Sequence, residues 1–177
     1  HKHSTVRRRL RERSRALASD RMARGDEPPL TPWLCDAVEA RFHHSSAEPL
    51  GVLVQALQVA REPNPQSGGI NCALSDRSHS IGAVLTADAV LRWRQTMTTY
   101  DHSRLNFAVL VLTRYELAIN EHTAQFTMRV HEFNWLCAAS GPIGQPNSIM
   151  ANPITRNLFD LATRSHARPV QSAPPPP

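Results

Sequence analysis

The sequence lacks the cysteine and histidine spacing of a metal site or a disulfide framework. Its three cysteines, Cys35, Cys72 and Cys137, lie far apart, and no CxxC or His-x₃₋₅-His pair accompanies them. The adjacent pair His43 and His44 does not supply a site, because sequence neighbours on a helix do not face one point. We therefore expect reduced, buried thiols, no metal and no cofactor.

Long apolar runs and catalytic motifs are also missing. The longest wholly apolar run, Phe107 to Leu112, is far too short to cross a bilayer, and no secretory signal is visible. There is no nucleophile elbow and no glycine-rich phosphate loop. Ser78, His79 and Ser80 read as a tight turn, in which His79 packs or bonds locally. We therefore expect a protein without a membrane span and without enzymatic activity.

Positive charge is concentrated at the start of the chain. Residues 1 to 26 carry nine of the 20 Lys and Arg residues but three of the 15 acidic ones, so the remainder is nearly neutral. The Arg-rich and Ser-rich segment 1–29 has too few large apolar residues to fold alone, and we expect a disordered basic tail. It fits a nuclear-import signal, a nonspecific nucleic-acid contact, a solvated tail or an organelle transit peptide. The arginines concerned are Arg7, Arg8, Arg9, Arg11 and Arg13.

The other end of the chain also has the composition of a linker. Pro174 to Pro177 close the sequence, and such a run makes no ladder hydrogen bonds. Residues 164–177 are therefore expected to begin a Pro-rich linker. The folded domain is expected to span residues 30–163.

Two short helices are expected before and among the strands. Thr31 and Pro32 have the residue types of an N-cap and a first helical position, which predicts a helix over about 32 to 42. Thr86 is expected to cap a second helix over residues 87–95. That helix leaves Val90, Leu91 and Trp93 available for packing.

A third helix is expected after a Gly, Pro and Ser loop over residues 140–148. Asn152 and the proline that follows it predict the start of the helix. Ile154, Leu158 and Leu161 are expected to form its apolar, core-facing side.

Five strands are expected between these helices. Alternation of apolar and polar residues marks a hairpin, with a polar reversal between its two strands, and the fourth strand is broken at Thr113 and Arg114. The expected strand segments are 51–61, 70–75, 81–85, 107–119 and 126–136. A mainly β chain with a helix between its third and fourth strands, and helices at both ends, has the order of a five-stranded OB-fold barrel. A barrel of this size is filled by side chains.

Five segments then carry a resemblance to a known family. They are "PWL" at 32–34, "GVLVQALQ" at 51–58, "LSDRSHSIGAVLT" at 74–86, "VHEFNWL" at 130–136 and "RNLFDL" at 156–161. Together, over Leu30 to Ala162, they resemble the OB domain of the shelterin bridging subunit of the ACD/TPP family, which includes the fungal Tpz-type protein. The chain is also similar to the small OB subunit of the Ever-Shorter-Telomeres group in telomerase holoenzymes.

The resemblance implies a non-enzymatic telomere protein in the nucleus. Such a module docks telomerase through its catalytic subunit and supports processive repeat addition. A region C-terminal to this chain is implied to bind the telomeric single-strand-binding shelterin subunit, and contact with telomeric DNA is weak or indirect. The small subunit of the telomerase holoenzyme is the alternative within the same biology.

Individual residues are carried over only where the segments match. Trp33 is implied to tie the N-terminal segment to the barrel, and Asp76 to be a structural cap or ion-pair residue, worth roughly 1–2 kcal/mol. The telomerase-contacting patch corresponds to the stretch after the inter-strand helix and the end of the fifth strand. Its members here are Arg94, Met97, Tyr100 and Leu136. The family's patch is acidic, whereas residues 95–99 carry no acid, so either the patch has a different chemistry here or this docking role is absent.

Direct binding of a single nucleic-acid strand is the rival interpretation. OB folds that bind single strands stack bases on aromatic side chains and follow the backbone with Lys and Arg. Residues 70–86 contain no Phe, Tyr or Trp and one basic residue, Arg77. A protein-docking module is therefore favoured, in which Trp93, Tyr100 and Trp135 are either exposed contact residues or plugs of the core.

Overall fold

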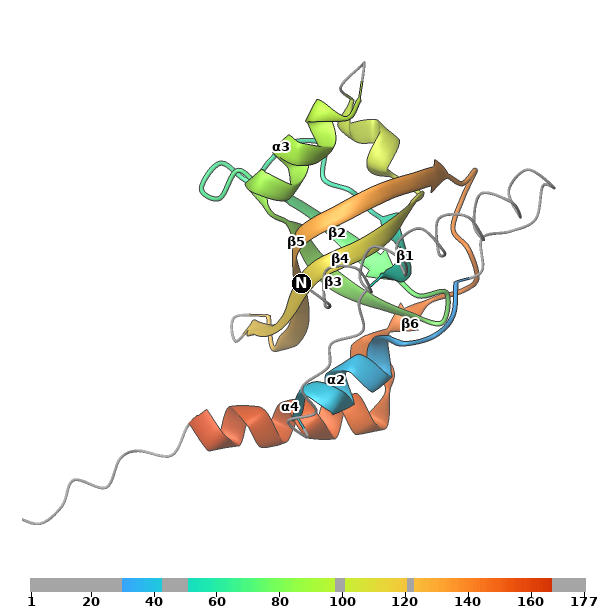
Figure 1. The fold of residues 1–177 in the computed structure, drawn as a ribbon. Coiled ribbons are helices and arrows are strands. Elements are labelled where there is room, and N and C mark those ends of the chain that lie inside the picture. The colour runs from blue at the N-terminus through green and yellow to red at the C-terminus, as the bar shows by residue number, and fades with distance from the viewer. Residues whose placement is uncertain (1–29, 43–50, 98–100, 121–122, 167–177) are drawn as a thin grey trace, which may run out of the picture.

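The computed structural model describes residues 30–42, 51–97, 101–120 and 123–166. A β-barrel lies at the centre, with α3 at one end and α2 with α4 at the other (Figure 1). In chain order the elements are α2 (Leu34–Phe42), β1 (Val52–Leu57), β2 (Ile70–Ser75), β3 (His79–Leu85), α3 (Ala87–Gln95), the 3₁₀ turn η1 (His102–Leu105), β4 (Ala108–Asn120), β5 (Gln125–Ala138), β6 (Asn147–Ser148), the 3₁₀ turn η2 (Ile149–Ala151) and α4 (Pro153–His166).

The strands close into a barrel in the manner of an OB fold. β1 pairs antiparallel with β2 and β4, and β4 pairs antiparallel with β5. β3 pairs antiparallel with β2 and parallel with β5, where Leu85 lies opposite Val130. The prediction of a five-stranded OB barrel with flanking helices is confirmed. The loop expected over 140–148 contains in addition the short strand β6, which pairs parallel with β3.

The expected break in the fourth strand is a bulge in one continuous strand. β4 runs through the whole of Ala108–Asn120, and its register against β5 shifts between Leu112 and Arg114 and again before Tyr115. A bulge leaves residues unpaired and bends the strand, which small barrels use to turn their corners. The interruption of the apolar pattern at Thr113 and Arg114 therefore marks a bend rather than a loop.

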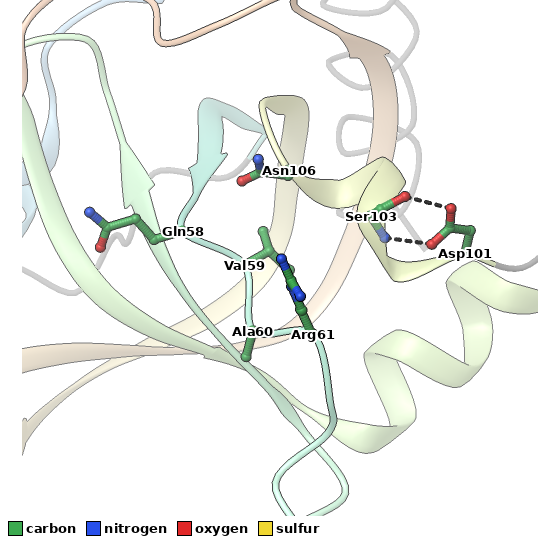
Figure 2. Close-up of a pocket in the computed structure, with 7 residues that line it drawn as sticks. All are labelled: Gln58, Val59, Ala60, Arg61, Asp101, Ser103 and Asn106. Carbon is green, nitrogen blue, oxygen red and sulfur yellow. Dashed lines mark hydrogen bonds between the residues drawn. The ribbon is translucent and has the colours of Figure 1, made fainter.

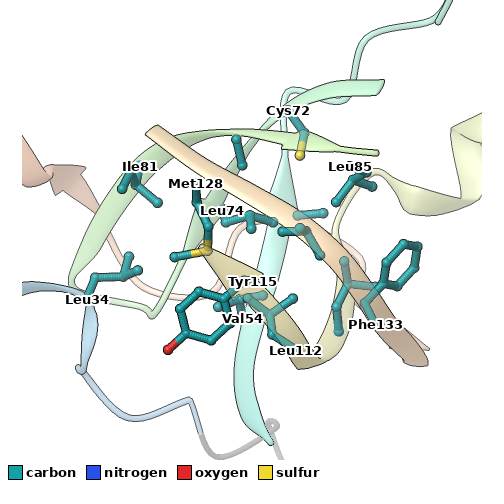
Figure 3. Close-up of a cluster of buried hydrophobic side chains, with 14 of the residues drawn as sticks. Leu34, Val54, Cys72, Leu74, Ile81, Leu85, Leu112, Tyr115, Met128 and Phe133 are labelled. Atoms are coloured by element: carbon teal, nitrogen blue, oxygen red, sulfur yellow. The ribbon is translucent and has the colours of Figure 1, made fainter. Parts of the chain in front are cut away.

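The barrel interior is filled by aliphatic and aromatic side chains from β1, β2, β3, β4 and β5 (Figure 3). Ile70, Cys72 and Leu74 of β2 all point inward, as their alternation predicted. Val54 and Leu112 meet them from β1 and β4, and both are 0% exposed. Burial of such side chains is the main stabilising term of a domain of this size.

Helix α3 has the predicted start and a partly different packing. The Thr86 hydroxyl accepts a hydrogen bond from Ala89 N–H at 3.3 Å, as expected for an N-cap. Trp93 is 3% exposed, and its ring lies 6.4 Å from that of Phe133. Trp93 is therefore a core residue, and its interpretation as an exposed contact residue is wrong. Leu91, which was expected to be available for packing, is instead 53% exposed.

Helix α2 begins at Leu34, two residues later than predicted, and Thr31 does not cap it. The carboxylate of Asp76, which follows β2, instead accepts hydrogen bonds from the N–H groups of Trp33 and Leu34 at the start of the helix. The cap residue is therefore distant in the sequence.

Helix α4 starts as predicted but faces the barrel with a different side. Asn152 Oδ1 accepts hydrogen bonds from the backbone N–H groups of residues 154 and 155, at 2.9 and 3.3 Å. Of the predicted apolar face, Leu158 is half-buried against the core, whereas the prediction is wrong for Ile154 and Leu161, which are 54% and 59% exposed. Phe159 points inward instead, with its ring 5.5 Å from that of Phe126. The helix also continues to His166, past the expected boundary at residue 163.

None of the helices in the described ranges is long and apolar enough to span a bilayer.

Candidate docking surfaces

Asp76 binds four backbone N–H groups with one buried carboxylate. Its Oδ2 accepts from Trp33 and Leu34 at 2.7 and 2.8 Å, which caps α2. Its Oδ1 accepts from Ser78 and His79 at 3.0 and 2.7 Å, which shapes the turn between β2 and β3. Asp76 is 0% exposed. Because hydrogen bonds to an ionised group are about twice as strong as neutral ones, this residue joins the N-terminal helix to the barrel.

Trp33 lies beside this carboxylate and is held in two further ways. Its indole Nε1 donates to the backbone oxygen of Leu53 at 3.2 Å, and its ring lies 5.5 Å from that of Tyr115. These contacts place Trp33 between α2, β1 and β4. Trp33 and Asp76 thus form one structural connection, as the family resemblance implied for each of them separately.

The Ser78-His79-Ser80 turn has no arrangement for nucleophilic catalysis. His79 Nδ1 is 3.9 Å from Asp76 Oδ1 and is buried without a hydrogen-bond partner in the described parts of the chain. The Ser80 hydroxyl donates to the backbone oxygen of Asn147 at 3.3 Å, away from the imidazole. The local role expected for His79 fits this geometry.

Gln55 is a buried polar residue that the sequence reasoning missed. It is 0% exposed, and its Nε2 donates to the backbone oxygens of Phe107 and Gly141 at 3.2 and 2.9 Å. Its Oε1 accepts from Ile143 N–H at 2.7 Å. The amide therefore ties β1 to the loop before β6. The only sequence signal was one glutamine inside the apolar segment VLVQAL.

The residues assigned to the telomerase-side patch differ in their exposure. Arg94 is exposed on α3, while Met97 is half-buried against the main core. Leu136 is half-buried in a second cluster formed with Leu30 and Val109. Tyr100 lies outside the described residues, as do the arginines of the basic tail. Among the described members of the patch, Arg94 is the exposed residue.

The outer face of α3 has an exposed apolar residue among cations. Leu91 shares this face with Arg94, three residues further on. Arg92 donates from Nη2 to the backbone oxygen of His131 at 2.7 Å, which anchors the helix surface to β5. Arginine is enriched among the residues that carry most of the binding energy of protein interfaces, which makes this face a candidate docking surface.

The outer face of β2 and β3 offers no stacking platform. The outward positions Asn71 and Gly82 are exposed, and Ala73 and Val84 are half-buried. These side chains are small or polar, whereas bases need aromatic faces to stack on.

In the described ranges, no group of three or more His, Cys, Asp and Glu residues is placed to hold a metal ion. Burial raises the pKa of the Cys72 thiol from 9.0 to about 12. Burial also raises the pKa of Cys35 and of Cys137. The Cys35 sulfur lies 3.4 Å from the Asn152 amide nitrogen, at the α2–α4 contact.

This chain is similar to known proteins in structure and not in sequence. No family model matches this chain, and no curated protein matches its sequence. The Est3 telomerase subunit of the yeast Hansenula polymorpha has a similar structure, with a TM-score of 0.55 and 8% sequence identity over 82% of this chain and 91% of that one. The chain has the OB fold. A murine DNA-binding protein bound to double-stranded DNA aligns with a TM-score of 0.33 and 12% identity, over 55% of this chain and 47% of that one, which is too weak to carry an argument.

Proposed function

We propose that this chain is a non-enzymatic OB-fold docking module of telomere maintenance, which acts in the nucleus and associates with the catalytic subunit of telomerase. The observation that carries the proposal is the structural similarity of this chain to the Est3 telomerase subunit. The similarity extends over 91% of that subunit. The five sequence segments that resemble telomeric OB domains point in the same direction.

Two forms of this role remain distinguishable by experiment. The sequence segments favour a shelterin-type bridging subunit of the ACD/TPP or Tpz kind, which recruits telomerase and supports its processivity. The structural similarity to Est3 favours a small subunit of the telomerase holoenzyme. A bridging subunit co-purifies with the telomeric single-strand-binding protein in cells that lack telomerase, whereas a holoenzyme subunit does not.

Docking of protein is better supported than binding of a nucleic-acid strand. The outer face of β2 and β3 carries Asn71 and Gly82 where base-stacking aromatics would be needed. The near-neutral charge of the chain after residue 26 also gives little phosphate attraction. Arg94 is exposed on α3 beside Leu91, and arginine is a residue type enriched in protein contacts.

The test is a quantitative pull-down of the purified telomerase catalytic subunit with the full chain. Leu91→Ala and Arg94→Glu are expected to weaken association by about tenfold, the loss shown by the minority of interface residues that carry most of the binding energy. Leu161→Ala is the matched control, because it removes a leucine of similar exposure, 59% against 53%, at the opposite end of the barrel. Equal binding by all four proteins would refute α3 as the docking surface.

Fluorescence anisotropy with a labelled telomeric single strand tests the rival role. We expect the barrel to contribute weak binding, with a Kd of roughly 10⁻⁴ M or poorer at physiological salt, and any tighter binding to come from the Arg-rich segment and to fall steeply with salt. Micromolar, sequence-selective binding that survives high salt would replace docking with direct strand recognition.

A further inference from the structure

A groove of about 640 Å³ lies where β1 leaves the barrel wall (Figure 2). One side is the segment Gln58–Arg61, which follows β1, and the other side carries Asp101, Ser103 and Asn106 around η1. The volume is in the range of sites that bind small ligands or short chain segments. The groove is separate from the outer face of α3 described above.

Hydrogen bonds fix the backbone next to the groove. β1 pairs with β4 only as far as Gln55, opposite Val109, and the Phe107 N–H then donates to the backbone oxygen of Ala56 at 2.8 Å. Gln55 holds the Phe107 carbonyl from the inside at 3.2 Å. Beyond Ala56 no described strand pairs with the segment Gln58–Arg61 on this side. The backbone turns at Gln58, whose φ is 49°, and a peptide segment has room to lie beside the residues that follow it.

The chemistry of the walls favours a peptide. The side-chain amides of Gln58 and Asn106 make no hydrogen bond to any described residue, so both offer a donor and an acceptor, as a peptide backbone requires. Val59 and Ala60 supply half-buried apolar surface between them. A nucleotide fits less well, because no aromatic side chain is among the lining residues.

Arg61 is the cation among the residues that line the groove and can pair with an acidic side chain. Arg61 is exposed and forms no ion pair within the described ranges. The opposing Asp101 carboxylate is already engaged, since its Oδ1 accepts from Ser103 N–H at 2.8 Å and its Oδ2 from the Ser103 hydroxyl. A guanidinium without a partner binds a carboxylate in a bidentate manner.

We propose that this groove binds an extended peptide segment of a protein partner, with an acidic side chain of that segment facing Arg61. The site adds a second contact region to the molecule, and its test requires no telomerase.

The test is a titration of the ¹⁵N-labelled full chain, followed by NMR amide shifts. The probe is an equimolar pool of acetylated, amidated pentapeptides of the form Ala-apolar-Glu-apolar-Ala, with Val, Leu or Phe at each apolar position. Shift changes confined to residues 58–61 and 101–106 support the proposal. The pool with Lys in place of Glu is expected to bind at least about tenfold more weakly, as a like charge meets Arg61.

Two variants separate the site from nonspecific attraction. Arg61→Glu is expected to weaken binding of the Glu pool by about tenfold or more, while Arg41→Glu, the same charge change on exposed α2 surface, leaves it unchanged. The spectra themselves report whether each variant is folded. Equal binding of both pools, shifts outside the groove, or groove shifts caused by oligothymidylate and not by the peptides would each overturn the proposal.

Discussion

The carboxylate of Asp76 lies 2.7 Å from the backbone nitrogen of Trp33, although 43 positions separate the two residues in the chain. A single buried side chain thus supplies the cap of α2 and the turn of the β2–β3 hairpin. The nine-residue helix α2 is too short to be stable alone, so its formation depends on this contact and on its packing against the barrel.

Replacement of Asp76 by alanine is expected to destabilise the domain by about 3–5 kcal/mol, because two buried and two partly buried N–H groups lose a charged acceptor. This exceeds the 1–2 kcal/mol expected from one turn bond. Urea denaturation of the full chain measures the loss. Asp88→Ala, which removes an exposed carboxylate from the first turn of α3, is the control and should cost less than about 1 kcal/mol. A loss below about 1 kcal/mol for Asp76→Ala would contradict the capping role.

Replacement of Gln55 by methionine is expected to cost about 2–4 kcal/mol, because the Ile143 N–H and the Gly141 carbonyl lose their partner, while the Phe107 carbonyl keeps the Ala139 N–H at 3.0 Å. The side-chain volume is nearly unchanged, so packing alone predicts a small effect. Thermal or urea unfolding checks the value against Gln66→Met on the exposed loop after β1. Equal stability of the two variants would show that the amide network is not stabilising.

Two apolar residues of α4, Phe159 and Leu161, are expected to differ in their contribution to stability, because the first is buried and the second is exposed. Phe159→Ala is expected to destabilise by about 3–4 kcal/mol, because it leaves a cavity against Phe126. Leu161→Ala should change stability by less than about 0.5 kcal/mol, because its side chain is 59% exposed. If the order of the two effects is reversed in urea unfolding, the helix faces the barrel as the sequence pattern suggested.

Alkaline pH is expected to destabilise the protein through Cys72. Burial raises the pKa of this thiol from 9.0 to about 12, so the native state favours the neutral form. The contribution of the neutral Cys72 thiol to the free energy of unfolding is fully present below pH 9 and is lost as the pH rises toward 12. Over this range the free energy of unfolding falls by up to about 1.4 kcal/mol per pH unit. The free energy of unfolding of Cys72→Ala should therefore fall less steeply between pH 9 and 11. Parallel curves for the two proteins would exclude this contribution.

Local signals in the sequence were sufficient for most of the fold. The alternation in β2 and β3 and the caps at Thr86 and Asn152 depend on contacts within a few residues, and each was predicted correctly. The face of α4 was not, because Ile154 and Leu161 satisfy the helical period as well as Phe159 does. Which side of a helix becomes buried is decided by the surface that it meets.

For the site residues too, local sequence identified some positions but not the distant contacts that those positions make. Asp76 was singled out by resemblance, but its bonds to Trp33 and Leu34 span 43 and 42 positions and follow from the closed barrel alone. Gln55 was visible as one polar residue in an apolar strand, yet its partners lie 52, 86 and 88 positions away. The exposure of Leu91 likewise depends on how α3 seats on β5.

The parallel seam between β3 and β5 has a consequence for how the chain folds during synthesis. The β2–β3 hairpin joins neighbouring residues and forms early, whereas the seam joins Leu85 to Val130 across α3 and β4 and must wait. The side chain of Gln55 can form all of its hydrogen bonds only after Ile143 has left the ribosome. A nascent chain that pauses before that point therefore exposes an open sheet with an unsatisfied core amide, which makes this interval the period of greatest risk of aggregation.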